Sequence, residues 1–358
     1  MGPIQFPNLG FEIEVGKSFM LFGKFEIAYY GITMALAMIF GAIVAYREAK
    51  RTGQKVDDYV DYTIFGILGG VVGARLYYVA FKWDTYKDDL LEIFNLRGGG
   101  MAIYGAVIGA ALVAVIFCKI KKMNFWKFAD TAVLGLITGQ IIGRWGNFFN
   151  REAFGSFTDS LFAMRIPLAD ASTGVLNPNA LEAITVTVNG AQYVQVHPTF
   201  LYESVLNLLL LLLMIIFRDK KKFYGETFCR YLIGYGVIRF IIEGFRTDQL
   251  RIGEIAVSQV LSAVLAAAGI IFVVIMRMRL KGKPAQIDAI PPKKKKDGKT
   301  QAAADGSEAA ESSAADGEAK EAPEGVSGEE ADNTETAAED SEPLETALGK
   351  TKEETDEK

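Results

Sequence analysis

Seven apolar stretches, each about 20 residues long, constrain the fold of this chain more than any other feature. They cover residues 25–46, 58–81, 99–118, 130–149, 198–217, 226–245 and 256–276. A helix of about 20 apolar residues crosses the hydrocarbon core of a bilayer, and it satisfies all its own backbone hydrogen bonds there. The sequence therefore predicts an all-α integral membrane protein with seven transmembrane helices.

Lysine and arginine residues predict how these helices are oriented. They gather after the first, third, fifth and seventh stretches, at 47–55, 119–127, 218–222 and 277–283, and the opposite loops are poorer in them. Positively charged loops remain on the cytoplasmic side of the membrane. We therefore expect the N-terminus outside and the C-terminus in the cytoplasm, with the first helix acting as the insertion signal and no cleaved signal peptide.

The longest loop on the outer side, about residues 150–197, is rich in turn-forming residues. Within it, the alternating segment ITVTV, the pair Asn189-Gly190 and the segment AQYVQV are typical of a β-hairpin with a two-residue turn. We expect this loop to form a small extracytoplasmic head containing a β-hairpin.

The C-terminal region differs from the rest in composition. Residues 301–358 hold 19 acidic and 4 basic side chains, a net charge of −15, whereas the whole chain of 358 residues carries −5. With almost no aromatic residues and a high charge, this segment cannot bury a core. We expect a membrane domain over residues 1–283 and a disordered acidic cytoplasmic tail over 284–358.

Small residues recur four positions apart in the second, third and fourth stretches. Such spacing lets helix backbones approach closely in lipid, so we expect these glycines to serve packing rather than chemistry. The pairs and triplet are Gly66/Gly70, Gly69/Gly73, Gly105/Gly109 and Gly135/Gly139/Gly143.

The segment Gly143–Gly155, GRWGNFFNREAFG, carries an arginine into the end of the fourth stretch. An arginine at a helix centre costs roughly 2.5–3.5 kcal/mol on insertion scales. On a continuous helix Arg144, Asn147 and Arg151 would share one face. One interpretation is an interfacial boundary, with Arg144 reaching the headgroups beside an aromatic belt. The other is a functional site.

Four polar residues in the sixth stretch favour the second interpretation. Tyr235, Arg239, Glu243 and Arg246 are spaced by four, four and three residues, so they form one helical stripe. Lipid chains offer these side chains neither hydrogen bonds nor opposite charges, so the stripe must face a cavity or another helix. Arg239 and Glu243 could simply neutralise each other. Alternatively, the arginines of the fourth and sixth helices converge on an anion such as a lipid phosphate, which arginine binds with two parallel hydrogen bonds.

Other candidate residues are weaker signals when taken one at a time. Tyr30 and Tyr104 fit an interfacial belt, Arg75 can reach the headgroups from its helix end, and His197 before Pro198 fits a capping residue. The chain has one histidine, and its two cysteines, Cys118 and Cys229, lie near helix ends beside basic clusters. We expect neither a metal site nor a cofactor, and we expect two free, buried thiols.

These motifs resemble those of the prolipoprotein diacylglyceryl transferases. The segment GRWGNFFNREAFG matches the family signature, and AYYG, HPTFLYE and YGVIRFIIEGFR resemble its first, fifth and sixth helices. RGGGMAIYG resembles the glycine loop of the family, with one departure: many members carry histidine where this chain has Tyr104. The resemblance covers about residues 20–280 and excludes the acidic tail.

The resemblance implies a bacterial inner-membrane enzyme. It would transfer the diacylglyceryl group of phosphatidylglycerol to a cysteine thiol in a lipoprotein precursor, forming a thioether and releasing glycerol phosphate. Its partners would be these two substrates and the bilayer, with no nucleic acid. The expected catalytic residues are Arg144, Arg239, Tyr104 and Glu243, and the expected substrate-binding residues are Tyr30, Asn147, Glu152, Gly155, His197, Tyr235 and Arg246.

Two other classes of membrane protein are alternatives. Arginines at helix ends could form the constriction of an anion transporter or channel, although the sequence lacks paired inverted repeats with matching broken helices. A seven-helix receptor would need no arginine pair at the outer lipid level.

Overall fold

Seven long helices dominate the part of the chain that the computed structural model describes, namely residues 1–95, 99–173, 176, 178–247, 251–252 and 255–288. They are α1 (Tyr29–Arg51), α2 (Val56–Phe81), α4 (Ile103–Ile120), α5 (Phe125–Asn150), α7 (Thr199–Phe217), α8 (Glu226–Phe245) and α9 (Val257–Arg279). Each overlaps one of the apolar stretches identified in the sequence. Helix α5 begins earlier than expected because the side chain of Asn124 accepts hydrogen bonds from the first free N–H groups.

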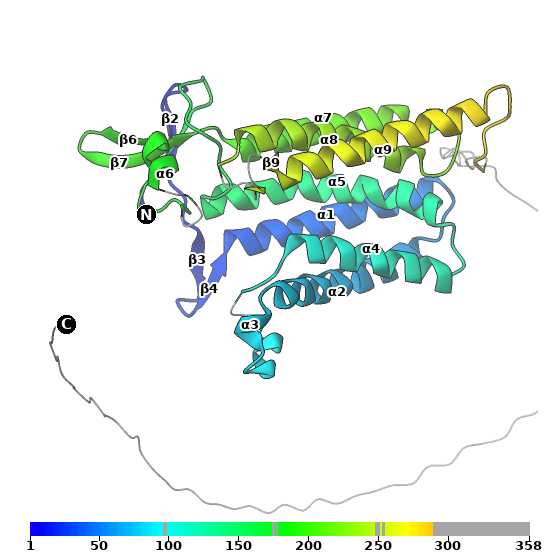
Figure 1. Cartoon of the computed structure of the whole chain (residues 1–358), viewed down its shortest axis with the longest axis horizontal. Coiled ribbons are helices and arrows are strands. Elements are labelled where there is room, and N and C mark those ends of the chain that lie inside the picture. The colour runs from blue at the N-terminus through cyan, green and yellow to red at the C-terminus, as the bar shows by residue number, and fades with distance from the viewer. Residues whose placement is uncertain (96–98, 174–175, 177, 248–250, 253–254, 289–358) are drawn as a thin grey trace, which may run out of the picture. The chain divides into compact units, whose positions relative to one another are not determined.

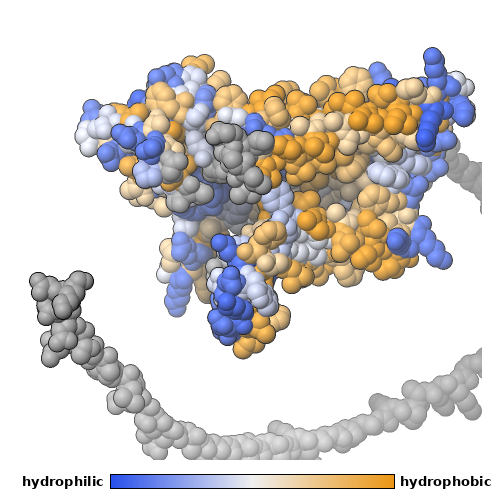
Figure 2. Space-filling view, viewed as in Figure 1, coloured by the Kyte–Doolittle hydropathy of each residue, from blue (hydrophilic) through white to orange (hydrophobic). Residues whose placement is uncertain are grey.

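The outer surface of this bundle is apolar. Five of the described helical segments are long and apolar enough to cross a membrane: α1, α2, α4, α9, and α7 extended to Lys220. At most a third of the apolar window of each is buried inside the protein. Figure 2 shows hydrophobic residues over most of the visible side of the bundle, with hydrophilic residues gathered at its two ends. Such a distribution is that of a multi-pass membrane protein.

Helices α5 and α8 are the two long helices that are not among these five. Helix α5 carries Arg144, and α8 carries Arg239 and Glu243. Helix α5 packs against both α1 and α7, and α8 packs against both α7 and α9 (Figure 1). The helices that carry the charged residues therefore lie against several neighbours, which gives these side chains protein partners in place of lipid.

Glycines bring two helix pairs into backbone contact, as expected from their spacing. A Cβ atom added to Gly135 of α5 would lie 2.4 Å from the carbonyl oxygen of Gly41 in α1. One added to Gly109 of α4 would lie 2.2 Å from the carbonyl oxygen of Gly69 in α2. Gly73 and Gly105 are equally close to each other, whereas the positions of Gly66, Gly70, Gly139 and Gly143 meet no backbone atom of another helix so closely.

A five-stranded antiparallel sheet forms a head at one end of the bundle (Figure 1). Its strand order is β2 (Phe11–Ile13), β1 (Ile4–Phe6), β5 (Met164–Pro167), β7 (Ala191–Val196) and β6 (Thr185–Val188). The hairpin β6–β7 was expected, and Asn189 and Gly190 between its strands both have positive φ, as a type I′ turn requires. The contribution of residues 4–13 to the same sheet was not expected.

Shorter elements complete the described chain. They are the hairpin β3 (Ser18–Leu21) and β4 (Phe25–Ala28), α3 (Trp83–Tyr86), η1 (Leu90–Phe94), α6 (Pro178–Ile184), η2 (Arg218–Lys220), and the two-residue strands β8 (Arg251–Ile252) and β9 (Ile255–Ala256). The head is held by one buried apolar cluster that includes Ile4, Ile166, Val194 and Val196.

The four Lys/Arg-rich segments, 47–55, 119–127, 218–222 and 277–283, lie together at the other end of the bundle, which we call the basic end (Figure 1). Ion pairs join them to one another and to neighbouring helices: Arg51 to Asp219 at 2.6 Å, and Lys221 to the buried Asp130 at 2.9 Å. The two cysteines are free and buried, as expected. The expected tail falls almost entirely on residues outside the described part of the chain.

Candidate active site

Arg144 and Arg239 meet at one carboxylate inside the bundle. Arg144 of α5 lies 2.8 Å from Oε1 of Glu203 in α7, and Arg239 of α8 lies 3.3 Å from its Oε2. The hydroxyl of Tyr235 donates to the same carboxylate at 3.4 Å. Three helices that are distant in sequence therefore supply one polar cluster, which we call the Arg–Glu cluster (Arg144, Glu203, Arg239 and Glu243).

The Arg–Glu cluster compensates its own charge. Arg239 also forms a 2.6 Å ion pair with Glu243 one turn further along α8. The side chains of Glu203 and Glu243 are each 2% exposed, and those of Arg144 and Arg239 are 22% and 16% exposed. Two cations thus face two almost completely buried anions. The local Arg239–Glu243 pair and the convergence of the two arginines, which were alternatives from the sequence, are both present.

Glu203 is the member of this cluster that sequence reasoning missed. It lies within the segment HPTFLYE and begins the second turn of α7. A carboxylate inside a stretch as apolar as TFLYESVLNLLLLLLMIIF is as costly in lipid as the arginines, so it needs a partner inside the protein. Its presence there was a signal equal to that of Arg144.

A strip of polar groups continues from Glu203 toward the middle of the bundle. The ring of Tyr235 stacks on that of Tyr231 at 5.3 Å, and Nε2 of Gln140 donates to the Tyr231 hydroxyl at 2.9 Å. Asn207, one turn after Glu203, is fully buried, and neither of its amide atoms has a hydrogen-bond partner among the described residues. Buried polar atoms normally form hydrogen bonds, so the unpaired amide of Asn207 lowers the stability of the bundle. The bundle therefore keeps polar groups in this region at a cost in free energy.

Part of the signature segment lies beside Arg144. The amide of Asn147 donates to Oε1 of Glu152 at 2.9 Å, and Asn150 reaches the same atom at 3.4 Å. The ring of Tyr30 packs on Gly146, where an added Cβ atom would come within 2.9 Å of it. The side chain of Tyr30 therefore lies near Glu152 and Arg144. The structure thus brings Tyr30, Asn147 and Glu152 to the head end of α5 next to the Arg–Glu cluster.

Arg151 does not share a helical face with Arg144 and Asn147, contrary to the expectation. Helix α5 ends at Asn150, and Arg151 adopts a left-handed conformation with φ of 56°. Its side chain, 1% exposed, turns into the head, where it binds Asp170 at 2.7 Å and the carbonyl oxygens of Gly2 and Val15. The arginine therefore fastens the head to the end of α5, because the helix stops one residue before it.

Gly155, His197 and Arg246 are joined to one another near the start of α7 and the end of α8, and we call these three residues the brace. The amide of Gly155 donates to the carbonyl of His197 at 3.0 Å, and Gly155 pairs with Arg246 in a β-bridge. A Cβ atom at Gly155 would lie 2.7 Å from Cβ of His197. The imidazole of His197 contacts the Tyr202 hydroxyl at 3.3 Å and the ring of Phe245, and burial lowers its pKa below the usual value.

Tyr104 lies at the start of α4, and its hydroxyl is 3.2 Å from the hydroxyl of Ser258 in α9. Within the described residues, no hydrogen bond or ion pair joins Tyr104 or His197 to the two arginines of the cluster. The side chain of Arg75 is 5% exposed and donates to the carbonyl oxygens of Glu92, Ile93, Gly99 and Gly100. Arg75 therefore does not reach for the headgroups. It holds η1 and the two glycines Gly99 and Gly100, which come shortly before Tyr104 in the chain.

Known proteins resemble this chain over most of the helical bundle. The family model of prolipoprotein diacylglyceryl transferase matches residues 17–275. A phosphatidylglycerol–prolipoprotein diacylglyceryl transferase of Clostridioides difficile is 42% identical over 254 residues, which are 71% of this chain and 92% of that protein. Proteins of the same name from Listeria monocytogenes and Bacillus cytotoxicus are 41% and 36% identical, over 72% and 75% of this chain and 88% and 95% of their own lengths.

The matched region contains α1 to α8, nearly all of α9, and every member of the Arg–Glu cluster. It includes the signature segment, the brace around Gly155 and the loop before Tyr104. The chain belongs to the prolipoprotein diacylglyceryl transferase family.

Proposed function

We propose that this chain transfers the diacylglyceryl group of phosphatidylglycerol to the thiol of a cysteine in the signal sequence of a lipoprotein precursor. The sulfur attacks the glycerol carbon that bears the phosphate ester. A C–S thioether bond forms, the C–O bond breaks, and glycerol phosphate leaves with the electron pair, while the thiol proton passes to solvent or to the phosphate. Relatives of this name match more than two thirds of the chain, and the transporter or channel alternative has no support.

The observation that carries the proposal is the meeting of Arg144 and Arg239 on one buried carboxylate. Charge grows on the phosphate oxygens as the C–O bond breaks, and donors already aimed at that position stabilise it most in a site that excludes water. Because Glu203 and Glu243 already compensate the two arginines, an incoming phosphate would replace Glu203 as a partner of at least one of them.

The remaining roles follow from the positions of the side chains. Glu243 orients Arg239, to which it is bound at 2.6 Å. Tyr30, Asn147, Glu152 and Tyr235 line the approach to Arg144 and bind the lipid headgroup. Tyr104 positions the lipid through its hydroxyl at the junction of α4 and α9. Gly155, His197 and Arg246 act by holding the head against the ends of α7 and α8, where the precursor would enter.

We also infer the arrangement in the membrane. All seven long helices cross the bilayer. This includes α5 and α8, because both are long enough and their charged side chains form ion pairs inside the protein. The basic end faces the cytoplasm and the head faces outward, in the inner membrane of a bacterium. Residues 1–283 form the transferase domain and 284–358 a cytoplasmic tail. Cysteine labelling of intact cells tests this: Asn189→Cys should react from outside and Ser312→Cys should not.

The direct test of the activity uses the purified full chain in detergent–lipid micelles. A peptide with a signal sequence and its cysteine is incubated with phosphatidylglycerol and analysed by mass spectrometry. We expect the peptide to gain one diacylglyceryl group and free glycerol phosphate to appear in equal amount. Phosphatidylcholine in place of phosphatidylglycerol, and a peptide with serine for cysteine, serve as controls. A monodisperse protein that leaves the peptide unmodified would contradict the proposal.

A further inference from the structure

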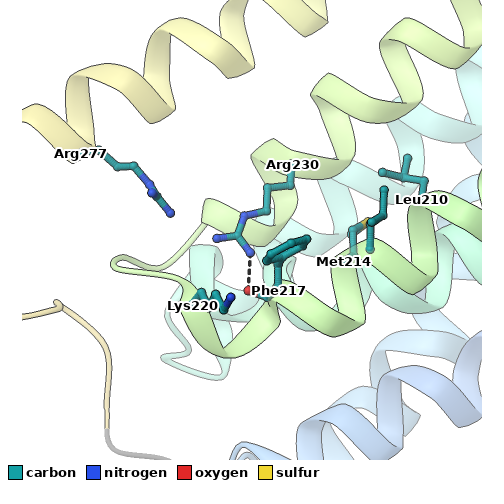
Figure 3. Close-up of a pocket in the computed structure, with 7 residues that line it drawn as sticks. Leu210, Met214, Phe217, Lys220, Arg230 and Arg277 are labelled. Carbon is teal, nitrogen blue, oxygen red and sulfur yellow. Dashed lines mark hydrogen bonds between the residues drawn. The ribbon is translucent and has the colours of Figure 1, made fainter.

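A cavity of about 380 Å³ opens at the basic end, between α7, α8 and α9 (Figure 3). Its floor is apolar and comes from the last turns of α7, including Met214 and Phe217. Its rim carries three cations from three different elements: Lys220 of η2, Arg230 of α8 and Arg277 of α9. Ligand pockets in proteins commonly measure about 300–1,000 Å³ and combine an apolar lining with a few polar groups.

Two of the three cations, Arg230 and Arg277, are held in place by one buried acid. Glu226, which is fully buried, accepts from Arg230 at 2.6 Å and from Nε of Arg277 at 3.2 Å. Arg230 also donates to the carbonyl oxygen of Phe217 at 2.6 Å. Figure 3 shows Arg230 and Arg277 extending toward one another from two helices. The two guanidinium groups are thus preorganised at the cavity by a carboxylate that lies behind them.

The cavity keeps an excess of positive charge. Three cations face the single carboxylate of Glu226, which leaves a net charge of about +2 under full ionisation. Among the described residues, no carboxylate lies within 4.0 Å of the ammonium group of Lys220, which sits 5.0 Å from the centre of the Phe217 ring. The side chain of Arg277 is 45% exposed. An anion can therefore reach at least two of the three cations.

The floor of the cavity continues into the lipid-facing surface. Leu213 is 52% exposed and Phe217 is 41% exposed, on the face of α7 that the bundle leaves uncovered. The cations lie where α7 and α9 end and α8 begins, which in the proposed membrane arrangement is the level of the phosphates of the adjoining leaflet. Arg230 is nine residues from Arg239 on α8, about 14 Å along the helix at 1.5 Å per residue. The cavity is therefore separate from the Arg–Glu cluster.

We propose that this cavity binds the headgroup of an anionic diacyl phospholipid from the leaflet at the basic end. The phosphate lies against Lys220, Arg230 and Arg277, and an acyl chain follows the apolar surface of Leu213 and Phe217. Basic pockets between membrane helices on the cytoplasmic side are suited to such headgroups. This site is a second lipid site that holds a resident lipid. It does not require the proposed transfer reaction, and the lipid bound there is not consumed.

The experiment measures lipid retention by native mass spectrometry. The purified full chain is exchanged into micelles with phosphatidylserine, which carries the anionic headgroup but is not the proposed substrate, or with phosphatidylcholine. We expect selective retention of phosphatidylserine. Lys220→Gln should weaken it about fivefold and Lys220→Gln/Arg277→Gln about 25-fold, since each cation near the surface contributes about fivefold.

A matched control removes the same charge from the same end of the bundle but outside the cavity. Lys281→Gln/Lys283→Gln should change retention by less than about twofold, because these exposed side chains do not line the cavity. Lys220 is exposed and carries no ion pair in the described chain, so its single variant should fold normally. Equal losses in control and cavity variants, or equal retention of phosphatidylcholine, would overturn the proposal. Displacement by millimolar inorganic phosphate alone would also overturn it, since the site would then recognise a free anion.

Discussion

Replacing Arg144 or Glu203 by glutamine should destabilise the bundle strongly, whereas replacing both should cost much less than the sum. The two side chains form a 2.8 Å ion pair in which the Glu203 side chain is 2% exposed. Removing one partner of a buried pair leaves the other charge uncompensated, which typically costs about 3–5 kcal/mol. The double variant removes both charges of this pair, so no uncompensated charge remains from it.

The magnitude depends on the other partners of each residue. In the Glu203→Gln variant, Arg239 retains Glu243 at 2.6 Å, so mainly Arg144 loses its compensation. In the Arg144→Gln variant, Glu203 retains Arg239 at 3.3 Å. We therefore expect about 3 kcal/mol for each single change and a coupling free energy of at least about 2 kcal/mol between them, near the upper part of the range seen for contacting residues.

The measurement is the free energy of unfolding of the four proteins of this double-mutant cycle in mixed micelles. The control cycle uses Arg51→Gln and Asp219→Asn at the basic end, where the ion pair is shorter, at 2.6 Å, but the Asp219 side chain is 59% exposed. Solvent-exposed pairs contribute about 1 kcal/mol or less. A coupling free energy for Arg144 and Glu203 no larger than that of the control would refute the argument that burial of Glu203 holds the arginines.

Three further predictions concern packing, protonation and the tail. Gly135→Ala should lower the unfolding free energy by about 1–3 kcal/mol, because the added Cβ would meet the Gly41 carbonyl oxygen. Gly143→Ala should be neutral or stabilising, and equal losses of stability in the two variants would contradict this prediction. The pKa of His197 is lowered by burial below 6.5, so the unfolded chain binds more protons and stability should fall as pH drops below about 6.5. His197→Asn should remove this part of the pH dependence of the unfolding free energy and reduce lipidation only modestly; an inactive, folded variant would make His197 the base. Truncation after Asp288, which binds Lys127 at 2.6 Å, should retain most of the lipidation rate, and its loss in a folded protein would give the acidic tail a role in the reaction.

The helices could be predicted from the sequence because the bilayer sets both their length and their composition. The turn at Asn189-Gly190 could be predicted because two residues with positive φ suit these side chains locally. The pairing of Gln5 with Arg165 could not, because it joins segments that are far apart in sequence and only three and four residues long. No local pattern specifies such a partner.

The candidate site could be predicted in part for a similar reason. Arg144 and Arg239 were found because an arginine in an apolar helix is costly and needs a partner. The same reasoning applied to Glu203 would have identified the acid between them. The roles of Arg75 and Arg151 could not be read from spacing, since both side chains bind backbone carbonyl groups of other segments whose paths only the folded structure defines.

The most direct test of the arginine site is the lipidation rate of Arg239→Gln compared with that of Arg239→Gln/Glu243→Gln, with folding checked by thermal stability in detergent. If Arg239 stabilises the leaving phosphate, its loss should lower the rate by about 10²–10³. Removing Glu243 as well cannot restore a donor, so we predict no rescue. A double variant whose rate returns toward that of the unmodified protein would show that the pair serves only to neutralise itself, and it would contradict the proposed role of Arg239.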